Sequence, residues 1–138
     1  MENSQRYPFV AADMDFGEAG FRPYLPLILS YKGKSSDVTG LLDSGAMVNV
    51  LPHSVGVELG ATWNEQTTHL QLTGNLAQVE ARVLLLSARV GTFPSVRLAF
   101  AWTKTDNVPL LLGQINFFRE YNFCFYRSEL ASEISQKR

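Results

Sequence analysis

The sequence is poor in cysteine and in charge. Among its 138 residues there is a single cysteine, Cys124, so no disulfide can form within the chain. Charged residues make up only 18% of the sequence, and the formal net charge is -1. The chain therefore lacks the basic footprint of proteins that bind nucleic acids or anionic membranes, and neither is expected as a partner.

Long apolar runs are absent as well. The longest, such as the three leucines at 84–86, are far too short to cross a bilayer. The N-terminus has no basic start followed by an apolar run, so we see no signal peptide and expect a cytoplasmic protein. The length suits one domain with a substantial core.

What the sequence does have is a series of short alternating apolar patterns, typical of β-strands. Leu25, Leu27 and Leu29 share one face of a strand, and a polar turn at 32–37 leads to a partner strand at 38–42. A longer hairpin is expected at 68–86, with its tip at residues 73–75. Further strands are expected near 84–90, 96–102, 110–112 and 121–126.

Helical signals are few. Pro52 suits the start of a short helix that ends at Gly60, and the spacing of Ile115 and Phe118 indicates one or two further turns. The sequence therefore predicts an all-β fold with one or two short helices. We divide it into an N-terminal arm (1–20), one domain (21–127) and a polar C-terminal tail (128–138) that is either a short helix or disordered.

The segment 40–47, GLLDSGAM, is the strongest candidate for a functional site. Asp43 follows two leucines, and burying a carboxylate is unfavourable unless it is paired or used. Gly45 permits a tight turn that brings backbone N–H groups close to that carboxylate. The Ser44 hydroxyl can hydrogen-bond a neighbouring loop. Asp, Ser and Gly also form ordinary surface turns, but the apolar residues on both sides of the tripeptide argue against one here.

The order of these parts resembles the retroviral-type aspartic proteases, the retropepsins. The shared parts are the LLDSGA run at 41–46 with a strand and a short helix after it, the glycine-tipped hairpin at 68–85, and Leu111-Leu112-Gly113 followed by a short helix and a terminal strand. Together they cover about residues 22–127. The resemblance implies the single lobe of an acid protease, built as a closed β-barrel.

The resemblance also implies an activity and a site. It makes the chain an aspartic endopeptidase, a hydrolase that acts on peptide or protein substrates by general acid–base activation of water, without a metal or other cofactor. The hairpin at 68–85 would be a flap over the substrate. The residues implied are the catalytic Asp43, its loop neighbours Ser44, Gly45 and Ala46, the flap-tip residues Gly74 and Asn75, and the pocket residues Pro109 and Leu111.

A single Asp-Ser-Gly is not enough for this chemistry. In aspartic proteases two carboxyl groups share one proton around a water molecule, because two like charges so close together cannot both ionise. The chain has no room for a second lobe, so the implied enzyme is a homodimer with one Asp43 from each subunit. Terminal strands such as residues 121–127 are where dimers of this family usually interleave.

Two positions depart from the family pattern. Met47 and Gln114 stand where retroviral members usually carry an aspartate and an arginine that pair with each other. Losing both is coherent, because a lone buried charge is strongly destabilising. The departure supports a second hypothesis, in which the fold is a catalytically silent dimeric module for peptide binding or assembly.

Other potential ligands lack partners in the sequence. Asp13 and Asp15 have no clustered carboxylates near them and are interpreted as part of a solvated arm. His53 and His69 have no Cys or His at ligand spacing, so no zinc site is expected. Cys124 lies in an apolar string without basic neighbours, which favours a small packing residue over a nucleophile.

Overall fold

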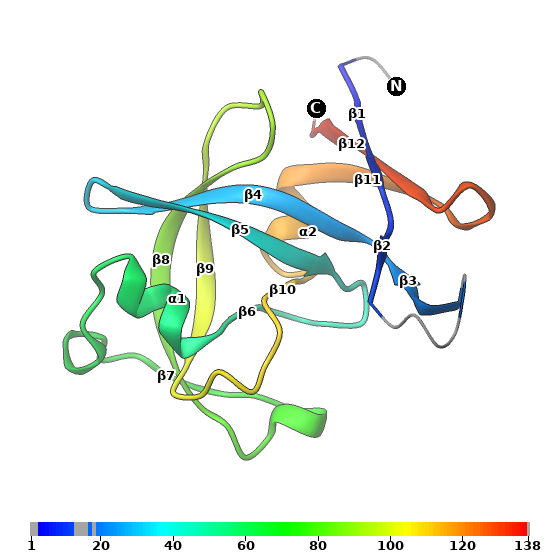
Figure 1. The fold of residues 1–138 in the computed structure, drawn as a ribbon. Coiled ribbons are helices and arrows are strands. Elements are labelled where there is room, and N and C mark those ends of the chain that lie inside the picture. Colours follow the sequence, from blue (N-terminus) through cyan, green and yellow to red (C-terminus); the bar gives the residue numbers. More distant parts are fainter. Residues whose placement is uncertain (1–2, 13–16, 18, 138) are drawn as a thin grey trace.

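The computed structural model describes residues 3–12, 17 and 19–137, and the described chain is mostly β (Figure 1). The main sheet has seven strands in the described chain, and six of them form a ring in which each is hydrogen-bonded to the next and the last, β8, pairs back with β4. These six strands therefore close into a barrel, as the resemblance to the retropepsins implies. In order around the barrel they are β4 (Tyr24–Tyr31), β5 (Lys34–Leu42), β10 (Leu111–Leu112), β6 (Asn49–Leu51), β9 (Val96–Thr103) and β8 (Glu80–Arg89).

The other strands and the helices are not part of this ring of six strands. β7 (His69–Gln71) pairs with β8 beyond the ring, and two short α-helices occur in the described residues, α1 (His53–Glu58) and α2 (Phe117–Glu120). A second sheet combines β1 (Gln5–Pro8), β12 (Ala131–Gln136) and β11 (Tyr121–Tyr126), and β2 (Val10–Ala11) pairs with β3 (Phe21–Arg22). The single-turn 3-10 helices are η2 (Trp63–Glu65), η3 (Gly74–Leu76) and η4 (Arg127–Glu129).

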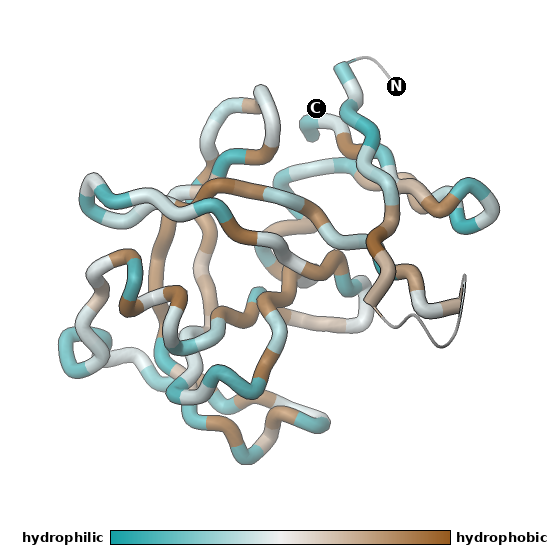
Figure 2. Tube along the Cα trace, in the orientation of Figure 1, coloured by the Kyte–Doolittle hydropathy of each residue, from teal (hydrophilic) through white to brown (hydrophobic). Residues whose placement is uncertain are grey.

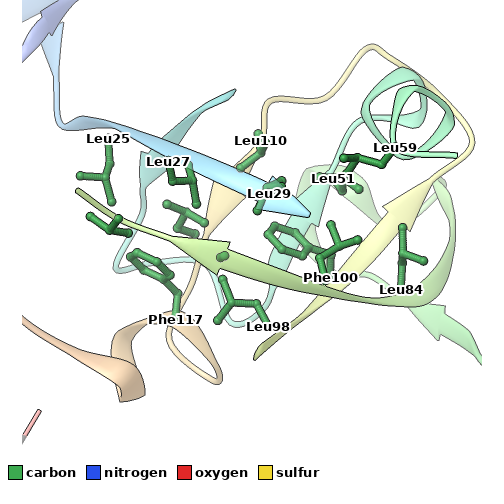
Figure 3. Packing of buried hydrophobic residues seen from close by; sticks show 14 of the residues in the cluster. Leu25, Leu27, Leu29, Leu51, Leu59, Leu84, Leu98, Phe100, Leu110 and Phe117 are labelled. Atoms are coloured by element: carbon green, nitrogen blue, oxygen red, sulfur yellow. The ribbon is translucent and has the colours of Figure 1, made fainter. Parts of the chain in front are cut away.

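The core fills the interior of the barrel. The three alternating leucines of β4 all face inwards, as the period-two pattern predicts, and they meet the inward side chains of β8 and β9 (Figure 3). Apolar segments run through the middle of the strands, whereas the turn between β4 and β5 is hydrophilic (Figure 2). The fully or almost fully buried residues at the centre are Leu25, Leu27, Leu29, Leu84, Leu98, Phe100 and Phe117.

Two strand boundaries differ from the prediction. The turn after β4 is tighter than residues 32–37, because β5 already begins at Lys34. The return arm of the long hairpin and the strand expected at 84–90 are one continuous strand, β8. β8 stays continuous because β9 pairs with it in unbroken register from Ala81 to Ala88.

Most of the described part of the polar tail is a strand, so the prediction of a short helix or disorder is wrong there. Residues Ala131–Gln136 form β12, which lies between β1 and β11 and pairs with both. The polar composition of β12 gives no apolar pattern from which a strand could be predicted. The strand forms because its backbone is hydrogen-bonded on both edges and because its one large apolar residue, Ile134, is fully buried in the main core. Arg6 of β1 adds ion pairs to Glu129 and Glu133 across this sheet.

The terminal strand β11 pairs along its whole length with β12 of the same chain. Its other edge has no partner strand among the described residues. The three-stranded sheet at the chain ends is therefore formed within one copy. Interleaving with a second copy remains a prediction, with the free edge of β11 as the place for it.

The structure shows the surroundings of only some of the other potential ligands. Asp13 and Asp15 lie outside the described residues. Within the described residues no cluster of three or more His, Cys, Asp or Glu side chains could hold a metal ion. His53 begins α1 and its ring stacks on that of Trp102, and Cys124 is half-buried. No helix in the described part of the chain has the length and apolar content needed to cross a bilayer.

Candidate active site

Asp43 is placed by the pairing of two parallel strands. β5 runs beside β10, with Leu41 opposite Leu111 and Leu42 opposite Leu112. The backbone N–H of Asp43 donates to the carbonyl of Leu112 at 3.1 Å, which continues this ladder by one bond. Asp43 therefore leaves the sheet next to the point where the chain leaves β10, and it is half-buried there.

The residues after Asp43 form a tight turn around its carboxylate. The N–H of Ala46 donates to the carbonyl of Asp43 at 3.0 Å, which closes the turn. The N–H of Gly45 donates to Asp43 Oδ1 at 2.9 Å and so fixes the direction of the side chain. We call residues 43–48 the Asp43 loop.

The segment after β10 supports the Asp43 loop from behind. The N–H of Gln114 donates to the carbonyl of Ala46 at 2.9 Å, and the side-chain amide of Gln114 donates to the carbonyl of Ser44. The approach is closest at Gly113, where an added Cβ would lie 2.6 Å from the carbonyl oxygen of Val48. No larger residue fits at position 113 without displacing the loop.

A cavity of about 440 Å³ opens in front of Asp43. Its floor consists of Asp43, Gly45 and the following loop residues as far as Val48, together with Val50 of β6 and Leu111 of β10. Residues 71–76, at the end of β7 and in η3, form the opposite wall. The cavity is therefore a cleft between the Asp43 loop and the tip of the long hairpin.

The hairpin tip is packed onto the barrel by apolar side chains. Leu72 is buried in a small cluster with Ala81 and Ala101, and Leu76 packs against the same cluster. Gly74 has φ +64°, a left-handed conformation that suits glycine at the tip. The wall opposite the carboxylate therefore combines the apolar Leu72 and Leu76 with neutral polar residues.

The structure brings most of the expected site residues together, but not all. Those that line the cleft are Asp43, Gly45, Ala46, Gly74, Asn75 and Leu111. Ser44 and Pro109 do not line it. Ser44 is exposed and contributes its carbonyl to the bond from Gln114, while Pro109 is exposed and its neighbour Val108 is buried with Leu111.

Asp43 is the sole ionisable side chain among the described residues that line the cleft. The other walls are aliphatic side chains, backbone and neutral polar groups such as Gln71, Thr73 and Asn75. The described residues of one copy thus offer this cleft one carboxylate, held at its floor. They do not offer a second carboxylate to share a proton with the first.

The sequence analysis missed one residue behind the site. Asn49 is fully buried and joins Gly113 to β9 by two hydrogen bonds. The available signal was a polar residue inside the apolar string MVNVLP at 47–52, but its partners lie far away in the sequence. The support that Gln114 gives to the Asp43 loop was likewise not evident, since position 114 was noted only as a departure from the family pattern.

Comparison with solved structures identifies the fold. The structure is similar to a retropepsin-like aspartic protease from Rickettsia conorii, with a TM-score of 0.65 and 17% sequence identity over 96% of this chain and 91% of that chain. It also matches an EIAV protease complexed with an inhibitor, with a TM-score of 0.49 and 19% identity over 67% of this chain and 81% of the other. The likeness to the Rickettsia conorii protease, over nearly the whole of both chains, shows that the chain has the retropepsin-like fold.

The comparisons at the level of sequence give no match. No protein-family model matches the chain, and no curated protein does. The similarity to known proteins is therefore one of fold, and the geometry of the cleft is the evidence for the reaction that Asp43 could perform.

Proposed function

We propose that the chain is an aspartic endopeptidase that works as a homodimer, with one Asp43 from each subunit. The observation that carries the proposal is the position of Asp43 at the floor of the cleft, where Gly45 N–H orients its carboxylate beneath the hairpin tip. The fold shared with the Rickettsia protease supports the same reading. The flap role of the hairpin, with Gly74 and Asn75 at its tip, belongs to this proposal.

The chemistry follows from a pair of carboxyl groups. Two Asp43 side chains brought together at a two-fold axis hold one proton between them, because both cannot be ionised at such short range. The ionised partner takes a proton from a water molecule, which attacks the peptide carbonyl, while the protonated partner donates its proton to the carbonyl oxygen. The first partner then passes the proton it took from water to the leaving nitrogen, and the second recovers its proton from the gem-diol as the C–N bond breaks. The aliphatic residues that line the cleft, such as Val48, Val50 and Leu111, accommodate apolar side chains of the substrate.

The test is cleavage of a broad peptide library at mildly acidic pH by the wild type and by Asp43→Asn. The wild type is expected to cut, and Asp43→Asn to lose activity by at least about a thousandfold, because its amide can neither take nor give the proton. Asp37→Asn is the matched control, since Asp37 is an exposed aspartate of β5, the strand that leads to Asp43. Equal cleavage by wild type and Asp43→Asn would show that Asp43 is not the catalyst.

The second hypothesis, a silent peptide-binding or assembly module, is distinguished by the same protein samples. A protein that dimerises in sedimentation experiments but cuts no library peptide and ignores a statine-type transition-state mimic would favour it. A chain that remains monomeric at high concentration contradicts the enzyme, because half of the carboxyl pair has no partner.

A further inference from the structure

Asn49 is a buried polar side chain in an apolar setting. It begins β6, and none of its surface is exposed. Burying an amide is unfavourable unless its donor and acceptor both find partners. Asn49 meets this condition with long-range contacts, because Nδ2 donates to the carbonyl of Ala99 at 3.1 Å and Oδ1 accepts from the N–H of Gly113 at 2.8 Å.

Gly113, the residue that Asn49 holds, lies directly under the Asp43 loop. A Cβ at this position would be 2.6 Å from the carbonyl of Val48 and 2.8 Å from that of Ala46. The next two N–H groups, of Gln114 and Ile115, bond the Asp43 loop at Ala46 and Met47 over 2.9 Å and 2.8 Å. The position of Gly113 therefore sets the height and tilt of the loop that carries the carboxylate.

The other end of this support is anchored on β9. The N–H of Ala99 donates to Asn116 Oδ1 at 2.5 Å, while its carbonyl accepts from Asn49. Two asparagines thus attach the 113–116 segment to one residue of a central strand, one at its carbonyl and the other at its N–H. Neither asparagine lines the cleft.

We propose that Asn49 is a positioning residue for the reaction of Asp43. It acts through Gly113 and the Asp43 loop, without touching the substrate, and it holds the carboxylate where its counterpart in the second subunit can share a proton with it. The inference rests on the proposed function. Its physical basis is that a shift of about 1 Å in a reacting group costs on the order of a hundredfold in rate.

Two substitutions separate positioning from bulk stability. Asn49→Leu keeps a similar volume but leaves Gly113 N–H without an acceptor. Asn49→Asp keeps the shape, and in its neutral form the introduced carboxyl both accepts from Gly113 and donates to Ala99. Thr103→Val is the matched control, because Thr103 is equally buried, but its hydroxyl bonds the carbonyls of Leu51 at 3.0 Å and Thr105 at 2.8 Å and not the 113–116 segment.

The kinetic readout is kcat and KM per active site, with sites counted by titration with a tight-binding statine-type peptide so that unfolded protein does not contribute. Asn49→Leu is expected to lower kcat about 10- to 100-fold with little change in KM. Asn49→Asp is expected to recover most of kcat at acidic pH, where burial keeps the new carboxyl neutral, and to lose it as the pH rises. Thr103→Val lowers stability but leaves kcat per site unchanged.

A second readout does not need activity. Amide hydrogen exchange followed by NMR is expected to be faster at Gly45, Ala46 and Gln114 in Asn49→Leu than in Thr103→Val, when both are compared at equal global stability. This result supports positioning even if the wild type cuts no peptide, which separates it from failure of the proposed function. Unchanged exchange in the loop, or unchanged kcat per site in Asn49→Leu, overturns the inference.

Discussion

At the scale of the residue, few groups in the described part of the chain hold Asp43. Its carboxylate receives one hydrogen bond from Gly45, and its backbone N–H is fixed by Leu112. The rest of the carboxylate faces the cleft, so it is free to meet water, substrate or a second carboxyl group. A carboxyl group with so few fixed contacts stays in a reactive position only if its surroundings are rigid. The segment after β10 provides that rigidity.

A separate residue, Tyr121, gives a test of the core through pH. It is almost fully buried and its hydroxyl finds no hydrogen-bond partner in the described part of the chain, and burial raises the pKa of Tyr121 to about 12. The unfolded chain ionises this group near pH 10, so the free energy of unfolding falls as the pH rises from about 10 to about 12.

Tyr121→Phe is therefore expected to unfold at the same or a higher urea concentration than wild type at pH 7, since it removes an unpaired hydroxyl. It should also lose less stability than wild type between pH 10 and pH 12, the window that the raised pKa defines. Equilibrium urea unfolding at several pH values measures both. A large destabilisation at pH 7 contradicts the unpaired state of the hydroxyl.

Some residues of the site could be predicted from a short sequence motif, and others could not. Asp43, Gly45 and Ala46 are neighbours in the sequence, so a short motif reveals them together. Asn49 and Gly113 are 64 residues apart, and their contact exists only because β6 and β10 become neighbours in the barrel. The local sequence pattern of either strand does not predict this pairing.

At the scale of the element, helix α1 is held by its contact with β9. Gly56 of α1 lies so close to Trp102 that an added Cβ would be 2.3 Å from the indole ring. The ring cannot move aside, because it is fully buried, stacks on His53 at 5.3 Å and donates from Nε1 to the carbonyl of His53 at 3.0 Å.

Gly56→Ala is expected to destabilise the protein by about 1–3 kcal/mol through overpacking, although alanine favours helix by about 1 kcal/mol relative to glycine. Glu58→Ala is the control on the exposed side of the same helix and should have little effect. Thermal and urea unfolding of both variants measure the difference. Gly56→Ala at wild-type stability would contradict the close packing.

Elements with a regular apolar period were predictable, and elements defined by their neighbours were not. The β4 leucines alternate, so both the strand and its buried face could be predicted. β12 has a single large apolar residue, and it is a strand because β1 and β11 supply partners on both edges. The same reasoning explains why β8 continues past the predicted break, since β9 pairs with it throughout.

At the scale of the whole molecule, the proposed dimer needs a face that carries the Asp43 loop to a second copy. Met47 and Ile115 are 57% and 50% exposed, and Ile115 N–H bonds the carbonyl of Met47 at 2.8 Å, so the two lie side by side at the edge of that loop. This exposed apolar pair offers a contact surface for a second copy beside the Asp43 loop. Burying it against a second copy is favourable.

Ile115→Asp is therefore expected to weaken dimerisation by at least about tenfold, because a buried unpaired charge would replace an apolar contact. Val57→Asp is the matched control, since Val57 of α1 is 52% exposed but lies away from the Asp43 loop. Analytical ultracentrifugation over a range of concentrations gives both dissociation constants. Equal effects of the two substitutions would place the dimer contact elsewhere.

The most direct measurement of the central claim is the activity of a mixed dimer that contains one wild-type subunit and one Asp43→Asn subunit, purified through two different affinity tags. If the two Asp43 carboxyl groups form a single site, the mixed dimer has only one of them and should cut peptides at least about a hundredfold more slowly than the wild-type dimer. Activity of about half the wild-type value would mean that each subunit works alone, and would contradict the shared site.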